Sequence, residues 1–365
     1  MSKHKIKIGI SHGDINGIGY EVIMKTLNDP RILEMCTPIV YGSPKVAAYH
    51  RKALDMEHFN FNTVRNAAEA DPRKANIINC IDDNIRVELG KISDLAGEAS
   101  YMALDAAVQD LKSGQIDALI TAPISKDNIQ SEKFNFPGHT EFLAEQFETN
   151  NYVMLMVSEM MKIGVVTTHV PLQKVAALIT KEAIVRKLRI ISASMEQDFS
   201  IKKPRIAVLG LNPHAGDGGL LGSEEKDIII PAIEQAKEEG ILAIGPYPCD
   251  GFFGSGDYTK FDAILAMYHD QGLTPFKVIS FERGVNFTAG LPVIRTSPAH
   301  GTAFDIAGEN KASCESFREA LYLAIDVHKN RMLHKEISKN PLRRYEINPN
   351  QVDESVGFAE DESTI

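Results

Sequence analysis

The stretch Leu265-Ala266-Met267-Tyr268-His269 is a short apolar run that leads into a histidine. The same pattern occurs twice more, in Val165-Val166-Thr167-Thr168-His169 and Leu209-Gly210-Leu211-Asn212-Pro213-His214. Short apolar runs separated by longer amphipathic stretches are typical of parallel strands covered by helices. In open parallel sheets, ligands bind beyond the carboxyl ends of the strands. The pattern therefore predicts an α/β fold with three imidazoles near one edge of its sheet.

The same alternation extends along the rest of the chain. Strands are expected at residues 6–10, 39–41, 118–121, 164–168, 205–211 and 263–267. Helices are expected at residues 97–112, 182–197 and 224–239, the last with Ser223 as its N-cap and Gly240 as its stop. Strands that alternate with helices indicate a mostly parallel sheet with both faces covered.

The bulk composition excludes several classes of function. The chain has 365 residues, which is enough for two packed cores, and a formal net charge of -10. Nucleic acid and anionic membranes need a continuous positive face, so neither is an expected partner. The four cysteines form no CxxC pair, which argues against disulfides and a thiolate zinc site. Without a long apolar run, we expect a soluble, cytoplasmic protein.

The three histidines could bind one metal ion together. Three imidazoles and an open coordination position form a catalytic site of the zinc type. Asp270, next to His269, and Asp250, before the segment Gly251–Gly256, could fix an imidazole tautomer or complete the coordination. Spacing along the chain does not prove convergence, so surface histidines and aspartates in helix caps or turns are the alternative.

Two glycine-rich segments predict tight turns. Residues 11–21 contain Gly13, Gly17 and Gly19 but lack the GxGxxG order, so close packing is favoured over a phosphate cradle. Residues 300–308 could admit a nucleotide close to the backbone or form a turn before a helix.

Polar side chains near these segments could bind an anion. Lys277, Asn286 and Arg295 follow the third histidine, and an arginine suits bidentate contact with phosphate or carboxylate. His139 and Thr140 follow Gly138 at a probable helix start, where backbone N–H groups could receive phosphate oxygens. Taken singly, the first three could be surface groups, and Thr140 could be an ordinary N-cap.

Several blocks in this order resemble the 4-hydroxythreonine-4-phosphate dehydrogenase family. That family has the two-domain α/β/α fold of isocitrate and isopropylmalate dehydrogenases, with the active-site cleft between the domains. The resemblance covers all but the acidic end of the chain. It is carried by residues 13–21, 121–126, 138–142, 168–172, 211–216, 268–272 and 290–308.

The resemblance implies a domain division and a set of site residues. Residues 1–130 with 285–345 would form the first domain, and residues 131–284 the second. His169, His214 and His269 would bind a divalent metal, with ligands shared across a homodimer interface, and Asp250 and Asp270 would support catalysis. Substrate would contact His139, Thr140, Lys277, Asn286 and Arg295. The cofactor NAD, or NADP, would lie on His300, Gly301, Thr302, Ala303 and Asp305.

The implied reaction is oxidation of 4-phosphooxy-L-threonine at C3, in pyridoxal phosphate biosynthesis. Its product, 2-amino-3-oxo-4-phosphooxybutanoate, would lose carbon dioxide to give 3-amino-2-oxopropyl phosphate. Zinc is the expected metal, with cobalt or magnesium as alternatives. The same chemistry on a phosphorylated sugar acid (a phospho-threonate) or a cyclic diol dicarboxylate is the nearest rival. A zinc hydrolase, a phosphate acyltransferase and a non-catalytic binding protein are more distant ones.

The sequence also departs from the family pattern. Ser11-His12, Asn16 and Tyr20 stand where Thr-Pro, Ala and Pro are common, and Leu220 stands where a histidine is frequent. These positions lie outside the matched site residues. Residues 351–365 carry five carboxylates and no Lys or Arg, so we expect a solvated tail with no part in the chemistry.

Overall fold

The computed structural model describes residues 5–340, so the acidic segment lies outside the described part of the chain. The strands are β1 (Lys7–Ser11), β2 (Thr37–Gly42), β3 (Asn62–Val64), β4 (Asn76–Asn79), β5 (Ala118–Thr121), β6 (Val153–Val157), β7 (Lys162–Val165), β8 (Arg205–Leu209), β9 (Leu242–Tyr247), β10 (Ala263–Ala266), β11 (Val285–Ala289) and β12 (Arg295–Pro298). The α-helices are α1 (Gly19–Leu27), α2 (Pro30–Met35), α3 (Pro44–Ala53), α4 (Asp94–Lys112), α5 (His139–Gln146), α6 (Leu172–Leu178), α7 (Lys181–Gln197), α8 (Ile230–Glu238), α9 (Cys249–Gly254), α10 (His269–Ser280) and α11 (Glu315–Ile337).

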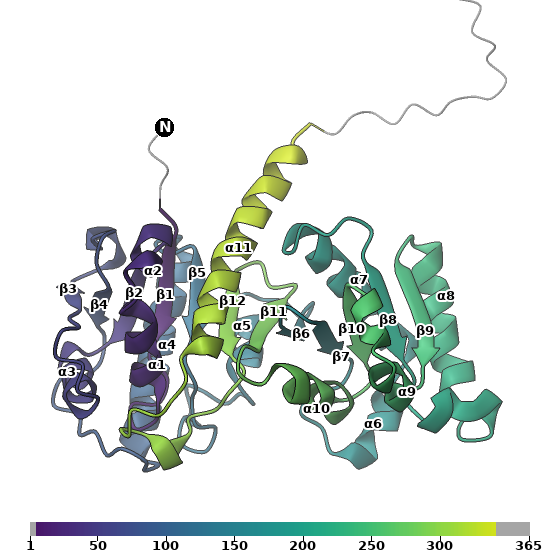
Figure 1. The fold of residues 1–365 in the computed structure, drawn as a ribbon, viewed down its shortest axis with the longest axis horizontal. Helices are drawn as coiled ribbons and strands as arrows, with labels where there is room; N and C mark the ends of the chain where they lie inside the picture. Colours follow the sequence, from purple (N-terminus) through teal and green to yellow (C-terminus); the bar gives the residue numbers. More distant parts are fainter. Residues whose placement is uncertain (1–4, 341–365) are drawn as a thin grey trace, which may run out of the picture.

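All of these strands join one sheet, in the order β3-β4-β2-β1-β5-β12-β11-β6-β7-β10-β8-β9. The two ends of the sheet are parallel, while β6 pairs antiparallel with both β7 and β11 at its centre. Figure 1 shows the resulting shape: β1–β5 with α1–α4 form one lobe, β7–β10 with α6–α9 form the other, and α11 crosses between them. The expected two-lobed, mostly parallel α/β fold is confirmed.

Apolar strands and capped helices account for this arrangement. Every residue of β5, β6 and β10 is buried, as expected for strands covered on both faces. The hydroxyl of Ser93 accepts a hydrogen bond from the Ala96 N–H at the start of α4, and Thr180 does the same for Ala183 at the start of α7. Each such cap stabilises its helix by about 1 kcal/mol.

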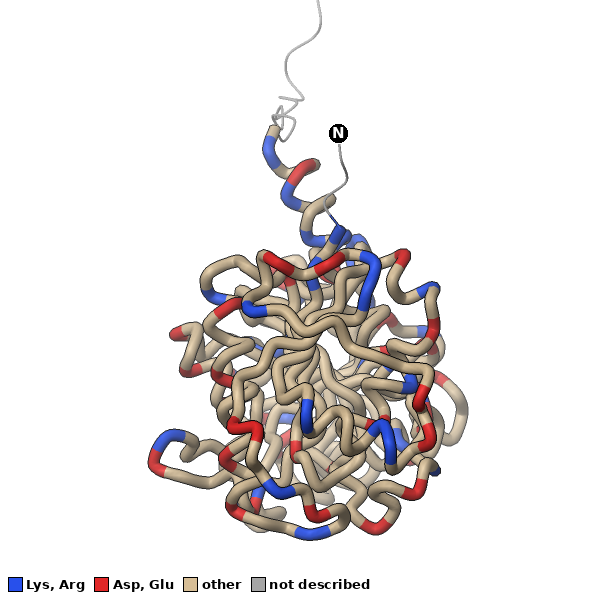
Figure 2. The backbone as a smooth tube through the Cα atoms, turned by 90° about the vertical axis from the view of Figure 1, so that its left-hand side faces the viewer, with Lys and Arg blue, Asp and Glu red and all other residues tan. Residues whose placement is uncertain are grey.

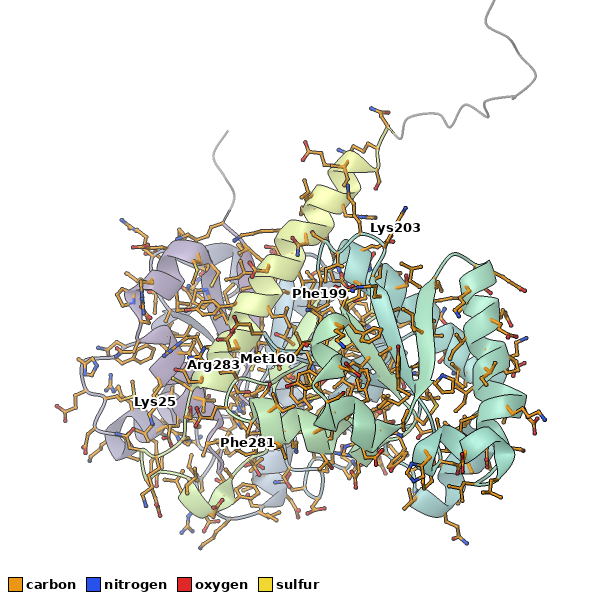
Figure 3. All side chains as sticks on the ribbon, turned by 45° about the vertical axis from the view of Figure 1, so that its right-hand side comes forward. Lys25, Met160, Phe199, Lys203, Phe281 and Arg283 are labelled. Carbon is orange, nitrogen blue, oxygen red and sulfur yellow. The ribbon has the colours of Figure 1, made fainter. Side chains whose placement is uncertain are left out.

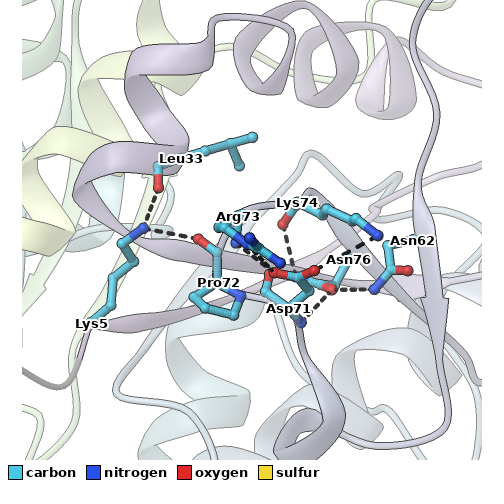
Figure 4. Close-up of polar contacts among 8 residues, drawn as sticks. All are labelled: Lys5, Leu33, Asn62, Asp71, Pro72, Arg73, Lys74 and Asn76. Atoms are coloured by element: carbon cyan, nitrogen blue, oxygen red, sulfur yellow. Dashed lines mark hydrogen bonds and ion pairs between the residues drawn. The ribbon is translucent and has the colours of Figure 1, made fainter.

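Hydrogen bonds of one buried side chain, Asn76, connect the strands at the outer edge of the first lobe. The amide nitrogen of Asn76 donates to the carbonyls of Asp71 and Lys74, and its oxygen accepts from Asn62 and from the Asp71 N–H (Figure 4). The same nitrogen also donates to the Pro38 carbonyl in β2. Because Asn76 is fully buried, these bonds satisfy a side chain that would otherwise cost free energy. They fix the edge strands β3 and β4 to β2.

The first glycine segment packs closely, as predicted. A Cβ on Gly13 would lie 2.3 Å from the Pro123 carbonyl oxygen, and one on Gly17 would lie 2.8 Å from that of Thr302. Gly17 therefore lies against the loop at 300–308, and the neighbouring Ile18 N–H donates to the Thr302 oxygen of that loop at 3.0 Å. The glycines therefore let two loops approach each other.

The departures from the family pattern in this segment form a packed unit. The rings of His12 and Tyr20 stack at 5.2 Å, and Tyr20 stacks on His50 at 5.0 Å. Asn16 donates to the Lys91 carbonyl and accepts from the Glu88 N–H. These residues therefore belong to the buried interior of the first lobe and do not line the cavity described below.

Some predicted boundaries were wrong. The strand predicted at 118–121 is confirmed, whereas those predicted at 164–168, 205–211 and 263–267 end at residues 165, 209 and 266. The helix predicted at 224–239 begins with a π-turn at Glu225–Ile229 before α8, and its start has no side-chain cap, so Ser223 does not act as predicted. Gly240, with φ of +84°, follows the end of α8, as predicted for a stop.

The surface carries charges of both signs. On the face shown in Figure 2, Lys and Arg residues are interspersed with Asp and Glu residues. Within residues 5–340, no helix is both long enough and apolar enough to cross a membrane.

Candidate active site

A cavity of about 250 Å³ collects residues from both lobes. Its walls come from the segment after β5, the start of α5, strands β6, β11 and β12, the turn after β7, and helix α10. Of the predicted site residues, it brings together His139, Thr140, His169, His269, Lys277, Asn286, Arg295, His300 and Gly301. It does not contain His214, Asp250, Asp270, Thr302, Ala303 or Asp305.

Arg295 is the buried cation of this cavity. Its side chain is 2% exposed, and its guanidinium donates to the hydroxyls of Thr121 at 2.7 Å, Thr140 at 3.4 Å and Thr288 at 3.4 Å. No carboxylate in residues 5–340 forms an ion pair with it. Burial lowers the pKa of Arg295 to about 10, against the opposing effect of Glu141, so it stays charged at neutral pH. A buried charge of this kind calls for an anionic ligand.

Other polar atoms in the cavity also lack partners. The buried Nε2 of His139, Oδ1 of Asn286 and Nε2 of His300 have no hydrogen-bond partner within the described residues. Burial, with Arg295 and Lys126 nearby, holds the pKa of His139 well below its ordinary value, so its ring is neutral at pH 7. Because an unsatisfied buried polar atom costs about 1–3 kcal/mol, these groups indicate a ligand site.

The three strand-end histidines follow adjacent strands, since β10 lies between β7 and β8. The rings of His169 and His269 lie 6.1 Å apart in the cavity. His214 is exposed and lies outside it, on a turn where residues 214–218 all have positive φ. Within residues 5–340 of one chain, no group of three His, Cys, Asp or Glu side chains is placed to hold a metal.

Two buried side chains shape the ends of these strands. Gln271 donates to the Gly210 carbonyl after β8 and accepts from the Met267 N–H after β10. The carboxylate of Glu225 accepts from the N–H groups of Leu211 and Asn212, each at 2.7 Å. These bonds replace the strand ladder, so the strands end earlier than their apolar runs suggest.

Carboxylates lie beside both imidazoles of the cavity. Asp270 Oδ1 is 2.6 Å from His269 Nδ1, and Glu141 Oε1 is 3.7 Å from His169 Nδ1. Burial alone would raise the pKa of Glu141, but His169 and Lys126 among its neighbours lower it below its usual value. Asp250 is exposed on α9, so its predicted supporting role stays a prediction.

The predicted cofactor loop borders the cavity only at its start. His300 and Gly301 line the cavity, whereas the Thr302 carbonyl is bonded to Ile18. Ala303 has a φ of +44°, and Asp305 is exposed on a short 3-10 helix. The loop therefore presents backbone near the cavity mouth.

Sequence reasoning missed several residues of the site. The cavity is also lined by Thr121, Lys126, Glu141, Met154, Met156 and Ser297. Thr121 is the last residue of a correctly predicted strand and Lys126 lies in the segment after it, so the strand-end argument used for the histidines could have found them. Thr140 is not the N-cap of α5, because Gly138 holds that position.

A two-lobed α/β sheet whose cavity holds a buried arginine and several imidazoles is typical of an enzyme that binds a small anionic substrate. A family model described as pyridoxal phosphate biosynthetic protein PdxA matches residues 34–324. The chain is 56% identical over 345 residues to 4-hydroxythreonine-4-phosphate dehydrogenase of Bacteroides thetaiotaomicron, covering 94% of both chains. It therefore belongs to the PdxA family, and as a member it is an oxidoreductase.

Solved structures agree with this assignment. The crystal structure of 4-hydroxythreonine-4-phosphate dehydrogenase from Klebsiella pneumoniae superimposes with a TM-score of 0.76 at 33% identity, covering 89% of this chain and 100% of that one. A terephthalate 1,2-cis-dihydrodiol dehydrogenase from Burkholderia xenovorans, at 24% identity and a TM-score of 0.60, covers 88% of this chain and 98% of that one. The second likeness shows the fold alone.

Proposed function

We propose that the chain oxidises 4-phosphooxy-L-threonine at C3 with NAD as hydride acceptor. The single observation that supports this most is a cavity that combines Arg295, which has no ion-pair partner within residues 5–340, with two imidazoles, His169 and His269. The product of this oxidation, 2-amino-3-oxo-4-phosphooxybutanoate, is a β-keto acid, so its loss of carbon dioxide gives 3-amino-2-oxopropyl phosphate. The reaction belongs to pyridoxal phosphate biosynthesis, as the family description implies.

The chain's own groups suit the anionic parts of this substrate. Arg295 and Lys277 supply positive charge, and the N-terminal turn of α5 supplies backbone N–H groups beside His139 and Thr140. Neutral His139 and the Asn286 oxygen offer hydrogen bonds without adding charge. We assign the phosphate and carboxylate of the substrate to the cations and N–H donors among these groups. The Asn286 oxygen can only accept, so we assign it to a hydroxyl or amino group of the substrate.

A divalent metal, with zinc as the expected one, would be bound by His169, His214 and His269. These three side chains can meet only when they come from two subunits. His169 and His269 share one cavity, and carboxylates beside their Nδ1 atoms leave Nε2 available. The exposed His214 would be supplied by the partner subunit of a homodimer. A metal bound there supplies Lewis acidity toward the substrate hydroxyl.

Exposed apolar side chains support the proposed homodimer. Leu172, Leu220, Val278 and Phe281 are 72%, 78%, 82% and 68% exposed. Leu220 follows the His214 turn, and Phe281 lies at the surface just beyond the end of α10 (Figure 3). A second copy of the chain that packs on these side chains would remove them from water while it completes the ligand set.

The cofactor and domain assignments are part of the same proposal. NAD would bind where His300 and Gly301 open onto the cavity, with Thr302, Ala303 and Asp305 further along the loop. The division into residues 1–130 with 285–345 and residues 131–284 is supported by the cavity, which draws residues from both parts. The substrate would then bind between two lobes.

Production of NADH from 4-phosphooxy-L-threonine, with and without a chelator, tests the proposal. We expect absorbance at the NADH wavelength to rise, to stop with chelator, and to return with zinc. His214→Ala should abolish it without unfolding the protein. Faster turnover of a phosphorylated threonate would favour the sugar-acid rival, and turnover without NAD would favour a hydrolase.

A further inference from the structure

Glu141 is a half-buried carboxylate in the cavity that sequence reasoning did not identify. It lies in the first turn of α5 and reaches the turn after β7, where its Oε1 is 3.7 Å from His169 Nδ1. Its Oε2 is buried and has no hydrogen-bond partner within the described residues. The contact joins two elements far apart in the sequence, so the fold brings this carboxylate to this imidazole.

A similar arrangement occurs at the second imidazole. Asp270 Oδ1 lies 2.6 Å from His269 Nδ1, so both histidines carry a carboxylate on the same ring nitrogen. Asp270 is 81% exposed and adjacent in sequence, whereas Glu141 is 22% exposed and belongs to another element. Water screens the less exposed Glu141 less than Asp270, whereas Asp270 makes the shorter contact. Glu141 is the partner that the tertiary fold, and not the neighbouring sequence position, supplies.

We propose that Glu141 is a positioning residue that holds His169 with Nδ1 protonated and Nε2 directed at the metal. This inference rests on the proposed function, since it requires His169 to be a metal ligand. A carboxylate that accepts the second N–H of a ligating histidine fixes its tautomer and ring orientation. The 3.7 Å separation exceeds a hydrogen bond, and such contacts tighten when the site is loaded.

Calorimetric titration of the full-length protein with zinc tests the proposal. Loss of such a partner weakens metal affinity by about 10–100-fold, so we expect Glu141→Ala to bind zinc more weakly than the native protein by about that factor. Glu141→Gln keeps an acceptor oxygen, so its zinc affinity should lie between those of Glu141→Ala and the native protein. Glu145→Gln is the matched control, because Glu145 is exposed on the same helix outside the cavity. It should bind zinc like the native protein.

A second readout reports on the imidazole itself. In ¹⁵N NMR of the metal-free protein at pH 8, we expect His169 to carry its proton on Nδ1, and Glu141→Ala to increase the Nε2-protonated form. A merely structural role of Glu141 would not change this ratio. Should Glu141→Ala fail to fold, the Gln variant supplies both measurements.

The outcomes separate this inference from the proposed function. His169→Ala should lose zinc binding, and native affinity in that variant would overturn the metal site itself. Loss of binding in His169→Ala together with affinity within about twofold of native in both Glu141 variants would overturn the positioning role alone. A His169 proton already on Nε2 in the native protein would also overturn it.

Discussion

The guanidinium of Arg295 is buried, and its hydrogen bonds within the described chain go to neutral threonine hydroxyls. Proteins rarely bury an arginine without an anion nearby. A substrate phosphate or carboxylate would supply that anion, and the threonines would hold the guanidinium plane in one orientation. A lysine has the same charge but cannot make the paired contact of a guanidinium.

Arg295→Lys should therefore weaken substrate binding more than turnover. Loss of a charge-assisted hydrogen bond worth about 1.5–3 kcal/mol corresponds to a rise in KM of about 10–100-fold. Steady-state kinetics on the phosphorylated substrate measure it, with Arg283→Lys as the control, since Arg283 is largely exposed and pairs with Glu315. A KM unchanged in Arg295→Lys would contradict the assignment.

His12 and His50 make stability depend on pH. Burial lowers the pKa of each from 6.5 to about 4, so below pH 6.5 the unfolded chain binds more protons than the folded one. The free energy of unfolding should fall as the pH drops from about 6.5 to about 4, by up to about 3 kcal/mol for each histidine. His139 and His300, also with lowered pKa, add to this loss.

Denaturant unfolding at several pH values measures this slope. His12→Phe keeps an aromatic ring on Tyr20 and removes one titrating group, so its free energy of unfolding should depend less on pH between 6.5 and 4. An unchanged slope in the variant would show that His12 does not contribute.

At the scale of elements, the apolar runs predicted the strands better than the strand ends. β5 was predicted to the residue, because three apolar side chains and a β-branched threonine fill a strand that is buried throughout. β8 and β10 end early, because Glu225 and Gln271 take the backbone groups that a strand ladder would use. Gln271 binds Met267 from four residues away but reaches the Gly210 carbonyl from 61 residues away, and Glu225 reaches Leu211 from 14 residues away. A strand pattern contains neither of the two longer contacts.

Part of the site was predictable for a related reason. Parallel strands place their carboxyl ends on one edge, so His169 and His269 were expected together and the structure brings them together. Glu225, from a following helix, binds the backbone just before the positive-φ turn at His214, and the role proposed for His214 requires a second chain. Glu141 was missed because its contact with His169 exists only in the folded chain.

Glu225→Ala tests what holds the His214 turn. The N–H groups of Leu211 and Asn212 would lose their buried acceptor, which should cost about 2 kcal/mol of stability. Hydrogen exchange at residues 211–219 should accelerate, while residues 263–266 keep their protection. Glu234→Ala, an exposed position on α8, is the control and should change neither quantity. Equal exchange at 211–219 in both variants would contradict the role of Glu225.

At the scale of the whole molecule, one chain carries only part of the proposed metal site. Its cavity holds His169 and His269, while His214 faces solvent beside exposed Leu220. A two-fold dimer uses the same surface on both subunits, so each His214 would meet the opposite cavity. The central claim is therefore that two subunits together complete each site.

Complementation between two inactive variants tests this claim most directly. Co-expressed His214→Ala and His269→Ala chains with different tags allow the heterodimer to be purified and its zinc content and NADH production measured. If sites are shared, one of the two sites of the heterodimer contains all three native histidines, so we expect one zinc per dimer and about half the native activity. The two parent homodimers should have no bound zinc and no NADH production. A heterodimer without zinc or activity would contradict the account.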